Sequence, residues 1–207
     1  MTELLIVRHG RTPANAAGLK QGTINTPQTY LSEVGRAQAT ELAAYFDLSG
    51  ASALYVSPLE RTKQTAAILN AQAQLPVIED ARLLEISYGQ WDGQLNADLM
   101  AQYPEHFYPL IEDVKPSYAA VAQGETFAAV QARVKSFTDE IAQAHPTEQV
   151  VIVTHGFTVR SFAANVVNCQ ALEILEPANC SVSKIIIDPT THEQHLVYYN
   201  RTATISF

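Results

Sequence analysis

The stretch LLIVRHGRT, residues 4–12, determines how the rest of this 207-residue chain is interpreted. Its first four residues are apolar and two of them are β-branched, which is typical of a buried strand. Arg8, His9 and Gly10 follow directly. Polar and charged side chains at the carboxyl end of a buried strand suit the edge of an open α/β sheet, where ligands bind. The stretch therefore predicts a strand that leads into a ligand site.

A second stretch repeats this arrangement near the other end of the chain. Residues 150–153, VVIV, are apolar, and Thr154, His155 and Gly156 follow them. Two strands that each end in His-Gly bring two imidazoles and an arginine to one edge of a sheet. Because the arginine guanidinium matches the geometry of phosphate, the two stretches together predict a phosphate site.

Length and composition favour a single domain over residues 1–207. Apolar residues make up 47% of the chain and charged residues 16%, which is ordinary for a globular protein. No apolar run approaches the roughly 20 residues of a membrane span, and we find no signal-peptide pattern. The net charge of −8 argues against a nucleic-acid surface. We therefore expect neither a nucleic-acid nor a membrane partner.

The two cysteines, Cys169 and Cys180, stand in no metal-binding or redox spacing. We interpret them as reduced thiols and expect a cytoplasmic protein. Since the sequence has no histidine, cysteine or aspartate cluster with metal-ligand spacing, we predict no metal and no other cofactor. The oligomeric state stays open, with a dimer as one alternative.

Strands alternate with helical segments, which predicts an α/β three-layer sandwich with a mostly parallel central sheet and helices on both faces. Residues 13–30 are expected to form a long loop. Ser32 is predicted to begin one helix and Thr126 the longest one. A capping box at residues 57–60 predicts a further helix that carries Arg61 in its first turn.

Two more segments complete the expected architecture. Residues 181–187 and 195–199 flank a turn and predict a hairpin. Residues 94–123 are irregular, aromatic and acidic. We interpret them as a small cap insertion over the site rather than as a second domain.

An ordered series of motifs resembles the histidine phosphatase superfamily, which includes the cofactor-dependent phosphoglycerate mutases. The motifs are Arg8-His9-Gly10 with Thr12 and Asn15, Ser57 to Thr62 with Gln64-Thr65-Ala66, Leu84-Glu85 with Gly89, Trp91 and Gly93, Gly124-Glu125-Thr126, and Thr154-His155-Gly156. The resemblance implies a phosphoglycerate mutase-like fold and phosphoryl transfer through a phosphohistidine intermediate.

The resemblance also implies a role for each candidate catalytic residue. His9 resembles the nucleophile, and Glu85 resembles the acid that protonates the leaving alkoxide and later activates water. His155 is expected to contact the same phosphoryl group, while Arg8 and Arg61 hold the phosphate oxygens. Apolar neighbours suit the proposed acid, because loss of water raises the pKa of a carboxyl group.

Further residues are expected to line the phosphate pocket. Asn15 and Gln21 match pocket positions of the superfamily. Gly10 and Gly156 are expected to let the backbone approach the phosphate without a Cβ. Arg160 lies on the helix expected after the second of these glycines and can lean toward the site.

Three functions are compatible with these motifs: a metal-independent phosphomonoesterase, a cofactor-dependent phosphoglycerate mutase, and a non-catalytic module that binds phosphorylated ligands. The complete set of candidate catalytic residues argues against the module. Residues 94–123 contain one lysine, Lys115, and four acidic residues, which suits a phosphoglycerate trianion poorly. We predict a phosphatase for a small phosphorylated metabolite, with a neutral, cationic or aromatic leaving group near Phe107, Tyr108 and Tyr118.

Overall fold

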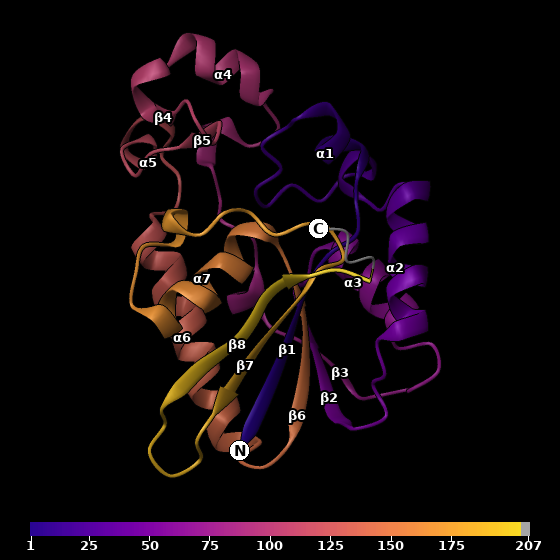
Figure 1. Ribbon diagram of the computed structural model, residues 1–207. Helices are drawn as coiled ribbons and strands as arrows, with labels where there is room; N and C mark the ends of the chain where they lie inside the picture. Colours follow the sequence, from indigo (N-terminus) through magenta and orange to yellow (C-terminus); the bar gives the residue numbers. More distant parts are fainter. Residues whose placement is uncertain (204–207) are drawn as a thin grey trace.

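A six-stranded sheet in the order β3-β2-β6-β1-β7-β8 forms the centre of the computed structural model, which describes residues 1–203 (Figure 1). Strands β1, β2, β3 and β6 are parallel, whereas β7 pairs antiparallel with β1 and β8 antiparallel with β7. The mostly parallel sheet is thereby confirmed, as is the C-terminal hairpin. The strands are β1 (Thr2–Arg8), β2 (Ala51–Val56), β3 (Val77–Glu79), β6 (Gln149–Thr154), β7 (Val182–Ile187) and β8 (Gln194–Arg201).

Helices cover both faces of this sheet, which confirms the predicted three-layer α/β sandwich (Figure 1). Successive residues of β1 face opposite layers: Leu4 and Ile6 pack with α6 and α7, and Leu5 and Val7 pack with α2 and α3. Burial on both faces explains why the strand is apolar without alternation. The covering helices are α2 (Glu33–Tyr45), α3 (Glu60–Leu69), α6 (Phe127–Ala144) and α7 (Gly156–Val167).

The expected helix starts are found at two of three positions. The Ser32 hydroxyl accepts a hydrogen bond from Gly35 N at 3.1 Å, and Thr126 does the same for Ala129 N at 3.2 Å. The capping box at residues 57–60 does not form, because α3 begins at Glu60 with no side-chain cap. Ser57 is buried and its Oγ lies 2.7 Å from a histidine ring nitrogen instead.

The segment 13–30 is not one long loop, so this prediction is wrong. It contains the helix α1 (Pro13–Ala17) and the 3-10 turn η1 (Pro27–Thr29). Thr12 caps α1 by accepting a hydrogen bond from Asn15 N at 3.0 Å, and proline occupies the first helical position. The Thr-Pro pair at residues 12–13 is therefore a helix start, although the polar composition of the segment favours a loop.

Residues 94–123 lie above the carboxyl ends of the parallel strands, and we refer to them as the cap (Figure 1). Two of its aromatic side chains, Phe107 and Tyr118, are buried and pack around Trp91. The cap consists of α4 (Asn96–Gln102), η4 (Pro104–His106), β4 (Phe107–Tyr108), β5 (Asp113–Val114) and α5 (Tyr118–Ala122). The remaining short turns are η2 (Ala81–Leu83), η3 (Gly89–Trp91) and η5 (Ala171–Glu173).

Two further observations concern the expected environment of the protein. None of the helices within residues 1–203 is both long and apolar enough to cross a bilayer. Cys169 and Cys180 are both free thiols, and burial raises the pKa of Cys180 to about 12. The second thiol is therefore protonated and unreactive at neutral pH.

Candidate active site

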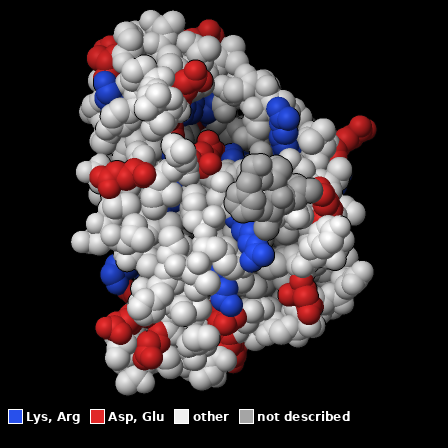
Figure 2. Space-filling model, viewed as in Figure 1, with Lys and Arg blue, Asp and Glu red and all other residues white. Residues whose placement is uncertain are grey.

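A cavity of about 1100 Å³ lies between the cap, the end of β1 and the start of α7. Figure 2 shows it as a hollow below the cap, with basic and acidic side chains at its edge. Most of the predicted site residues line this cavity, namely Arg8, His9, Asn15, Gln21, Arg61 and Glu85, and Arg160 lines it as well. Phe107, Tyr108 and Tyr118 do not line it, because two are core residues and the third faces outward. The expectation that these aromatics contact a leaving group is therefore wrong.

His9 directly follows β1 and is only 2% exposed. Its Nδ1 lies 2.7 Å from the carbonyl oxygen of Gly10, so this nitrogen carries the proton and donates it. Nε2 consequently holds the lone pair and has no partner among the described residues. Burial, with Arg61 and Arg8 nearby, holds the pKa of His9 well below its usual range. The site therefore contains a neutral imidazole with one uncommitted basic nitrogen.

Arg61 is 1% exposed and is held by three hydrogen bonds. Nη2 donates to Gly22 O at 2.7 Å, Nη1 to Ile24 O at 3.0 Å, and Nε to Nδ1 of His155 at 3.2 Å. Burial lowers the pKa of Arg61 to about 10, so it stays charged at neutral pH. Two of the three acceptors are carbonyls of the segment between α1 and η1. That segment therefore fixes the guanidinium in place.

His155 follows β6 and is completely buried. Its Nδ1 accepts the bond from Arg61, so Nε2 carries the proton and donates it to Ser57 Oγ at 2.7 Å. Burial and the neighbouring Arg61 hold the pKa of His155 well below its usual range. The rings of His9 and His155 meet edge to face with centroids 5.3 Å apart. Since both nitrogens of His155 are engaged, contact with a phosphoryl group stays a prediction.

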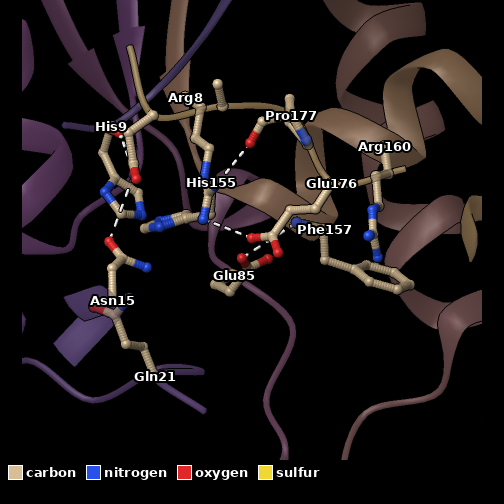
Figure 3. Close-up of polar contacts among 12 residues, drawn as sticks. Arg8, His9, Asn15, Gln21, Glu85, His155, Phe157, Arg160, Glu176 and Pro177 are labelled. Atoms are coloured by element: carbon tan, nitrogen blue, oxygen red, sulfur yellow. Dashed lines mark hydrogen bonds and ion pairs between the residues drawn. The ribbon is translucent and has the colours of Figure 1, made fainter. Parts of the chain in front are cut away.

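Arg8 is the last residue of β1 and lines the cavity, and its guanidinium is paired with a carboxylate. Nη2 lies 2.5 Å from Glu176 Oε1, and Nη1 donates to Pro177 O (Figure 3). Nε is buried and has no partner among the described residues. Glu176 lies on the connection between η5 and β7, and its side chain is 50% exposed. The cation expected to hold phosphate thus has an internal anionic partner.

Glu85 lies at the cavity wall, beside the first turn of α7. Its Oε2 accepts a hydrogen bond from Phe157 N at 3.2 Å, and its Oε1 accepts one from Ile86 N at 2.9 Å (Figure 3). Loss of water raises the pKa of Glu85, against the opposing effect of these two bonds and of Arg61. A raised pKa is what the sequence predicts for this carboxyl group.

Asn15 and Gln21 are both oriented by Thr12. The Thr12 N–H donates to Asn15 Oδ1 at 3.1 Å, and the Thr12 hydroxyl donates to Gln21 Oε1 at 2.9 Å. Each amide therefore presents its NH₂ group elsewhere, and neither NH₂ donates to a described residue. Both residues line the cavity, so they offer it two sets of uncommitted donors.

The two glycines are required for a reason that differs from the predicted one. Neither Gly10 nor Gly156 lines the cavity. A Cβ on Gly10 would lie 2.5 Å from the carbonyl oxygen of Gly35 in α2, and one on Gly156 would lie 2.6 Å from Glu176 Oε1. Close packing against the Gly35 backbone therefore excludes a side chain at Gly10, whereas a side chain at Gly156 would require the Glu176 side chain to move. A backbone contact with phosphate stays a prediction.

The part of the chain that the structure describes holds no group of three or more histidine, cysteine, aspartate or glutamate side chains placed to bind a metal. Arg8 and Arg61 provide the positive charge beside His9, and both line the cavity with it. Two guanidiniums beside a neutral imidazole form a site for a phosphate group.

Comparison with known proteins identifies the family. The family model described as histidine phosphatase superfamily (branch 1) matches residues 4–202. The chain belongs to this superfamily. Phosphoserine phosphatase 1 of Hydrogenobacter thermophilus is 35% identical over 161 residues, which cover 78% of this chain and 74% of that protein. A metal-independent phosphoserine phosphatase of Arabidopsis thaliana is 30% identical over 203 residues, which cover 95% and 84%.

The solved structures agree with this assignment. YhfR of Bacillus stearothermophilus superposes with a TM-score of 0.86 at 28% identity, over 98% of each chain. The phosphoglycerate mutase-like fold expected from the motifs is thus confirmed for this histidine phosphatase.

The sequence analysis missed four residues near the site of this histidine phosphatase. Ser57 orients His155 by accepting a hydrogen bond from its Nε2, a role that the predicted capping box does not reveal. Glu176, Lys20 and Asp113 line the cavity from three separate segments. Each of these three is an isolated charged residue outside the motifs, so only the tertiary structure shows that they share one cavity.

Proposed function

We propose that this protein hydrolyses small phosphomonoesters without a metal ion, through a phosphohistidine intermediate on His9. The observation that carries the proposal is the hydrogen bond from Nδ1 to the carbonyl of Gly10. It leaves Nε2 as the nucleophilic nitrogen at a cavity that also holds Arg8 and Arg61. A neutral, fixed imidazole between two cations is suited to attack a phosphorus atom.

The phosphate is held by charge and by hydrogen bonds. Arg8 and Arg61 neutralise its oxygens, and the free amide NH₂ groups of Asn15 and Gln21 donate to them. Catalysis of phosphoryl transfer depends on positioning and on stabilising the equatorial oxygens. Arg61, Asn15 and Gln21 are fixed by other residues before substrate arrives, so they need little reorganisation in the transition state. Arg8 is also held, but it must exchange Glu176 for the phosphate.

Transfer then proceeds in two steps. In the first, Nε2 of His9 forms the N–P bond, the ester P–O bond breaks, and Glu85 gives its proton to the departing alkoxide. In the second, ionised Glu85 takes a proton from water, and the resulting hydroxide attacks phosphorus and breaks the N–P bond. Inorganic phosphate leaves, and both His9 and Glu85 return to their starting protonation states.

The two alternative functions have less support from the site. A mutase would return the phosphoryl group to a phosphoglycerate, whereas the two relatives reported above, at 35% and 30% identity, are both named as phosphatases. A binding module has no need of a nucleophile or of a proton donor. Both His9 and Glu85 line the cavity.

The substrate is a small phosphorylated metabolite under this proposal. Two relatives are named as phosphoserine phosphatases, so O-phosphoserine is the first ester to test. The size of the cavity accommodates a leaving group of this size together with the phosphate.

The test measures turnover and the covalent intermediate together. The enzyme is mixed with O-phosphoserine and with p-nitrophenyl phosphate in the presence of EDTA, and part of each reaction is quenched in base, where phosphohistidine survives. We expect turnover and a base-stable, acid-labile phosphoenzyme, absent in His9→Ala and present in the control His192→Ala on the exposed turn before β8. Activity that EDTA removes and Mg²⁺ restores would contradict the proposal. Conversion of 3-phosphoglycerate to 2-phosphoglycerate faster than hydrolysis would favour the mutase.

A further inference from the structure

A second cluster of charged side chains lines the cavity, and the mechanism above does not use it. Asp113 of the cap lies 2.7 Å from Lys20 Nζ through Oδ1 and 2.7 Å from Arg160 Nη1 through Oδ2. The three residues come from the segment after α1, from β5 and from α7. Their side chains are 11%, 12% and 5% exposed for Lys20, Asp113 and Arg160. We refer to them as the Asp113 cluster.

The Asp113 cluster carries an unbalanced positive charge. Burial alone would raise the pKa of Asp113, but Lys20 and Arg160 lower it below its usual range, so the carboxylate is ionised at neutral pH. Within the cluster one anion then faces two cations. Burial lowers the pKa of Arg160, but Asp113 and, less strongly, Glu176 raise it above its usual range. Glu176 is already paired with Arg8. An excess charge in a buried place is costly unless a counter-ion is present, so the cluster is suited to an additional anionic group.

Arg160 has the geometry to accept that anion. Its Nη1 is used by Asp113, whereas Nε is buried without a partner among the described residues and Nη2 donates to none of them. Nε and Nη2 lie on one edge of the guanidinium and form the two-pronged donor that a carboxylate accepts. Lys20 adds a second positive charge and is held 4.9 Å from the ring centroid of Tyr88.

The position of Arg160 is on the leaving-group side of the cavity. Glu85, the proposed proton donor, is bonded to Phe157 N, and Arg160 lies one turn further along the same helix. Figure 3 shows Glu85 and Glu176 between the Arg8 end and Arg160. Glu85 and all three residues of the Asp113 cluster line the same cavity, so a leaving group whose ester oxygen meets Glu85 has room to extend toward the cluster.

We infer that Arg160, held by Asp113 and supported by Lys20, binds a carboxylate on the leaving group. The inference rests on the proposed hydrolase function. The preferred substrates are then phosphomonoesters of alcohols that carry a carboxylate, such as hydroxy amino acids. This differs from the neutral, cationic or aromatic leaving group predicted from the sequence. Asp113 is one of the four acidic residues on which that prediction rests, but two cations neutralise it.

Two esters that differ only in the carboxylate provide the test. The ratio of kcat/KM for O-phospho-L-serine to that for O-phosphoethanolamine is measured for the wild type and for Arg160→Gln. Hydrogen bonds to a charged group support a preference of about 10- to 100-fold for phosphoserine in the wild type. We expect Arg160→Gln to bring the ratio close to one.

Two further variants separate recognition from damage to the fold. The double variant Arg160→Gln/Asp113→Asn removes both partners of one ion pair and should also lose the preference. The control Arg133→Gln removes an arginine of α6 that pairs with Glu125 outside the cavity, and this variant should keep the preference. A wild type with no preference, or an Arg160→Gln variant that loses activity equally on both esters, would overturn the inference.

Equilibrium binding keeps the two proposals distinguishable. If the wild type hydrolyses neither ester nor p-nitrophenyl phosphate, the proposed function fails. Calorimetric titration with the same two esters then still tests the carboxylate site. Tighter binding of phosphoserine that Arg160→Gln abolishes supports the site, and equal affinity for the two esters refutes it.

Discussion

The ends of β1 and β6 have nearly the same sequence but different surroundings. The strands are parallel neighbours, with Arg8 opposite Thr154, and each continues into His-Gly. His9 bonds to the next carbonyl in its own chain segment and keeps one nitrogen free, whereas His155 uses both nitrogens, on Arg61 and Ser57. The comparison shows that segments remote in sequence determine what each histidine can do.

The same contrast holds for access to the cavity. His9 lines it and His155 does not, although both are almost fully buried. The second histidine instead fixes the Nε of Arg61, which does reach the cavity. We therefore interpret the first strand end as the position of chemistry and the second as its support.

The largest expected effect comes from exchanging each histidine for alanine. His9→Ala removes the proposed nucleophile, and loss of a nucleophile costs on the order of 10⁴-fold or more in kcat. His155→Ala leaves the nucleophile but frees Arg61, and loss of an electrostatic group costs about 10²- to 10³-fold. Steady-state kinetics with p-nitrophenyl phosphate and base-quenched phosphoenzyme levels measure both effects. Equal losses, with no phosphoenzyme in either variant, would remove the distinction between the two strand ends.

The next largest effect is expected for Glu85, which accepts a hydrogen bond from Phe157 N just after the end of β6. Glu85→Gln keeps the shape but removes the transferable proton, so hydrolysis of an alkyl phosphate should slow by roughly 10²- to 10⁴-fold. Release of p-nitrophenolate, which hardly needs a proton, should slow much less. Because kcat/KM reports the first transfer, it is compared for both substrates. Equal losses would show that Glu85 is not the proton donor.

The pH profile of the same variant provides an independent measurement. The proton on Glu85 is lost as the pH rises through its raised pKa, so the wild type should lose activity on alkyl phosphates on that alkaline side. Protonation of His9 removes the nucleophile, and its lowered pKa moves the acidic limb well below the usual range of histidine. Glu85→Gln should lack the alkaline limb and keep the acidic one. An alkaline limb that persists in the variant belongs to another group.

Sequence reasoning was most successful where signals are local. The apolar runs before His9 and His155, the helix start at Ser32 and the alternation of strands and helices predicted the sheet and its layers correctly. The family resemblance then placed six of the nine predicted site residues at the cavity. These signals depend on neighbours within a few positions, which the sequence records directly.

The failures occurred where a residue has two competing partners. Ser57 has the spacing of a helix cap, yet it bonds to His155 from another strand. Asp113 counts as one of four acids in the cap, yet Lys20 and Arg160 neutralise it from 93 and 47 positions away. Neither choice is decided by local propensity, because the competing partner becomes available only after the sheet and the cap have assembled.

Gly10 and Gly156 also allow the ends of β1 and β6 to be compared, with a smaller expected effect that is measured on stability. Gly10→Ala would bring a methyl group against the backbone of Gly35, which cannot move easily, so we expect a loss of about 1–3 kcal/mol in the free energy of unfolding. At this chain length about 1 kcal/mol lowers Tm by ~2–4 °C. Gly156→Ala meets only the flexible end of Glu176 and should lower Tm less. Thermal unfolding measures both, with Gly50→Ala as the control because its nearest neighbour is 3.8 Å away.

The smallest expected effect concerns Glu176, the carboxylate that packs over Gly156 and pairs with Arg8. In the free enzyme it occupies a guanidinium that the proposed mechanism assigns to phosphate. Glu176→Ala should therefore release Arg8 and lower the inhibition constants of inorganic phosphate and vanadate. Because the carboxylate is half-exposed, the gain should be about two- to fivefold, the range of a solvent-screened ion pair. Competitive inhibition is measured beside Glu173→Ala, an exposed glutamate three residues earlier that does not line the cavity. Weaker inhibition in Glu176→Ala than in Glu173→Ala would mean that the carboxylate positions Arg8 for the phosphate rather than competing with it, and the second strand end would then support both arginines of the site.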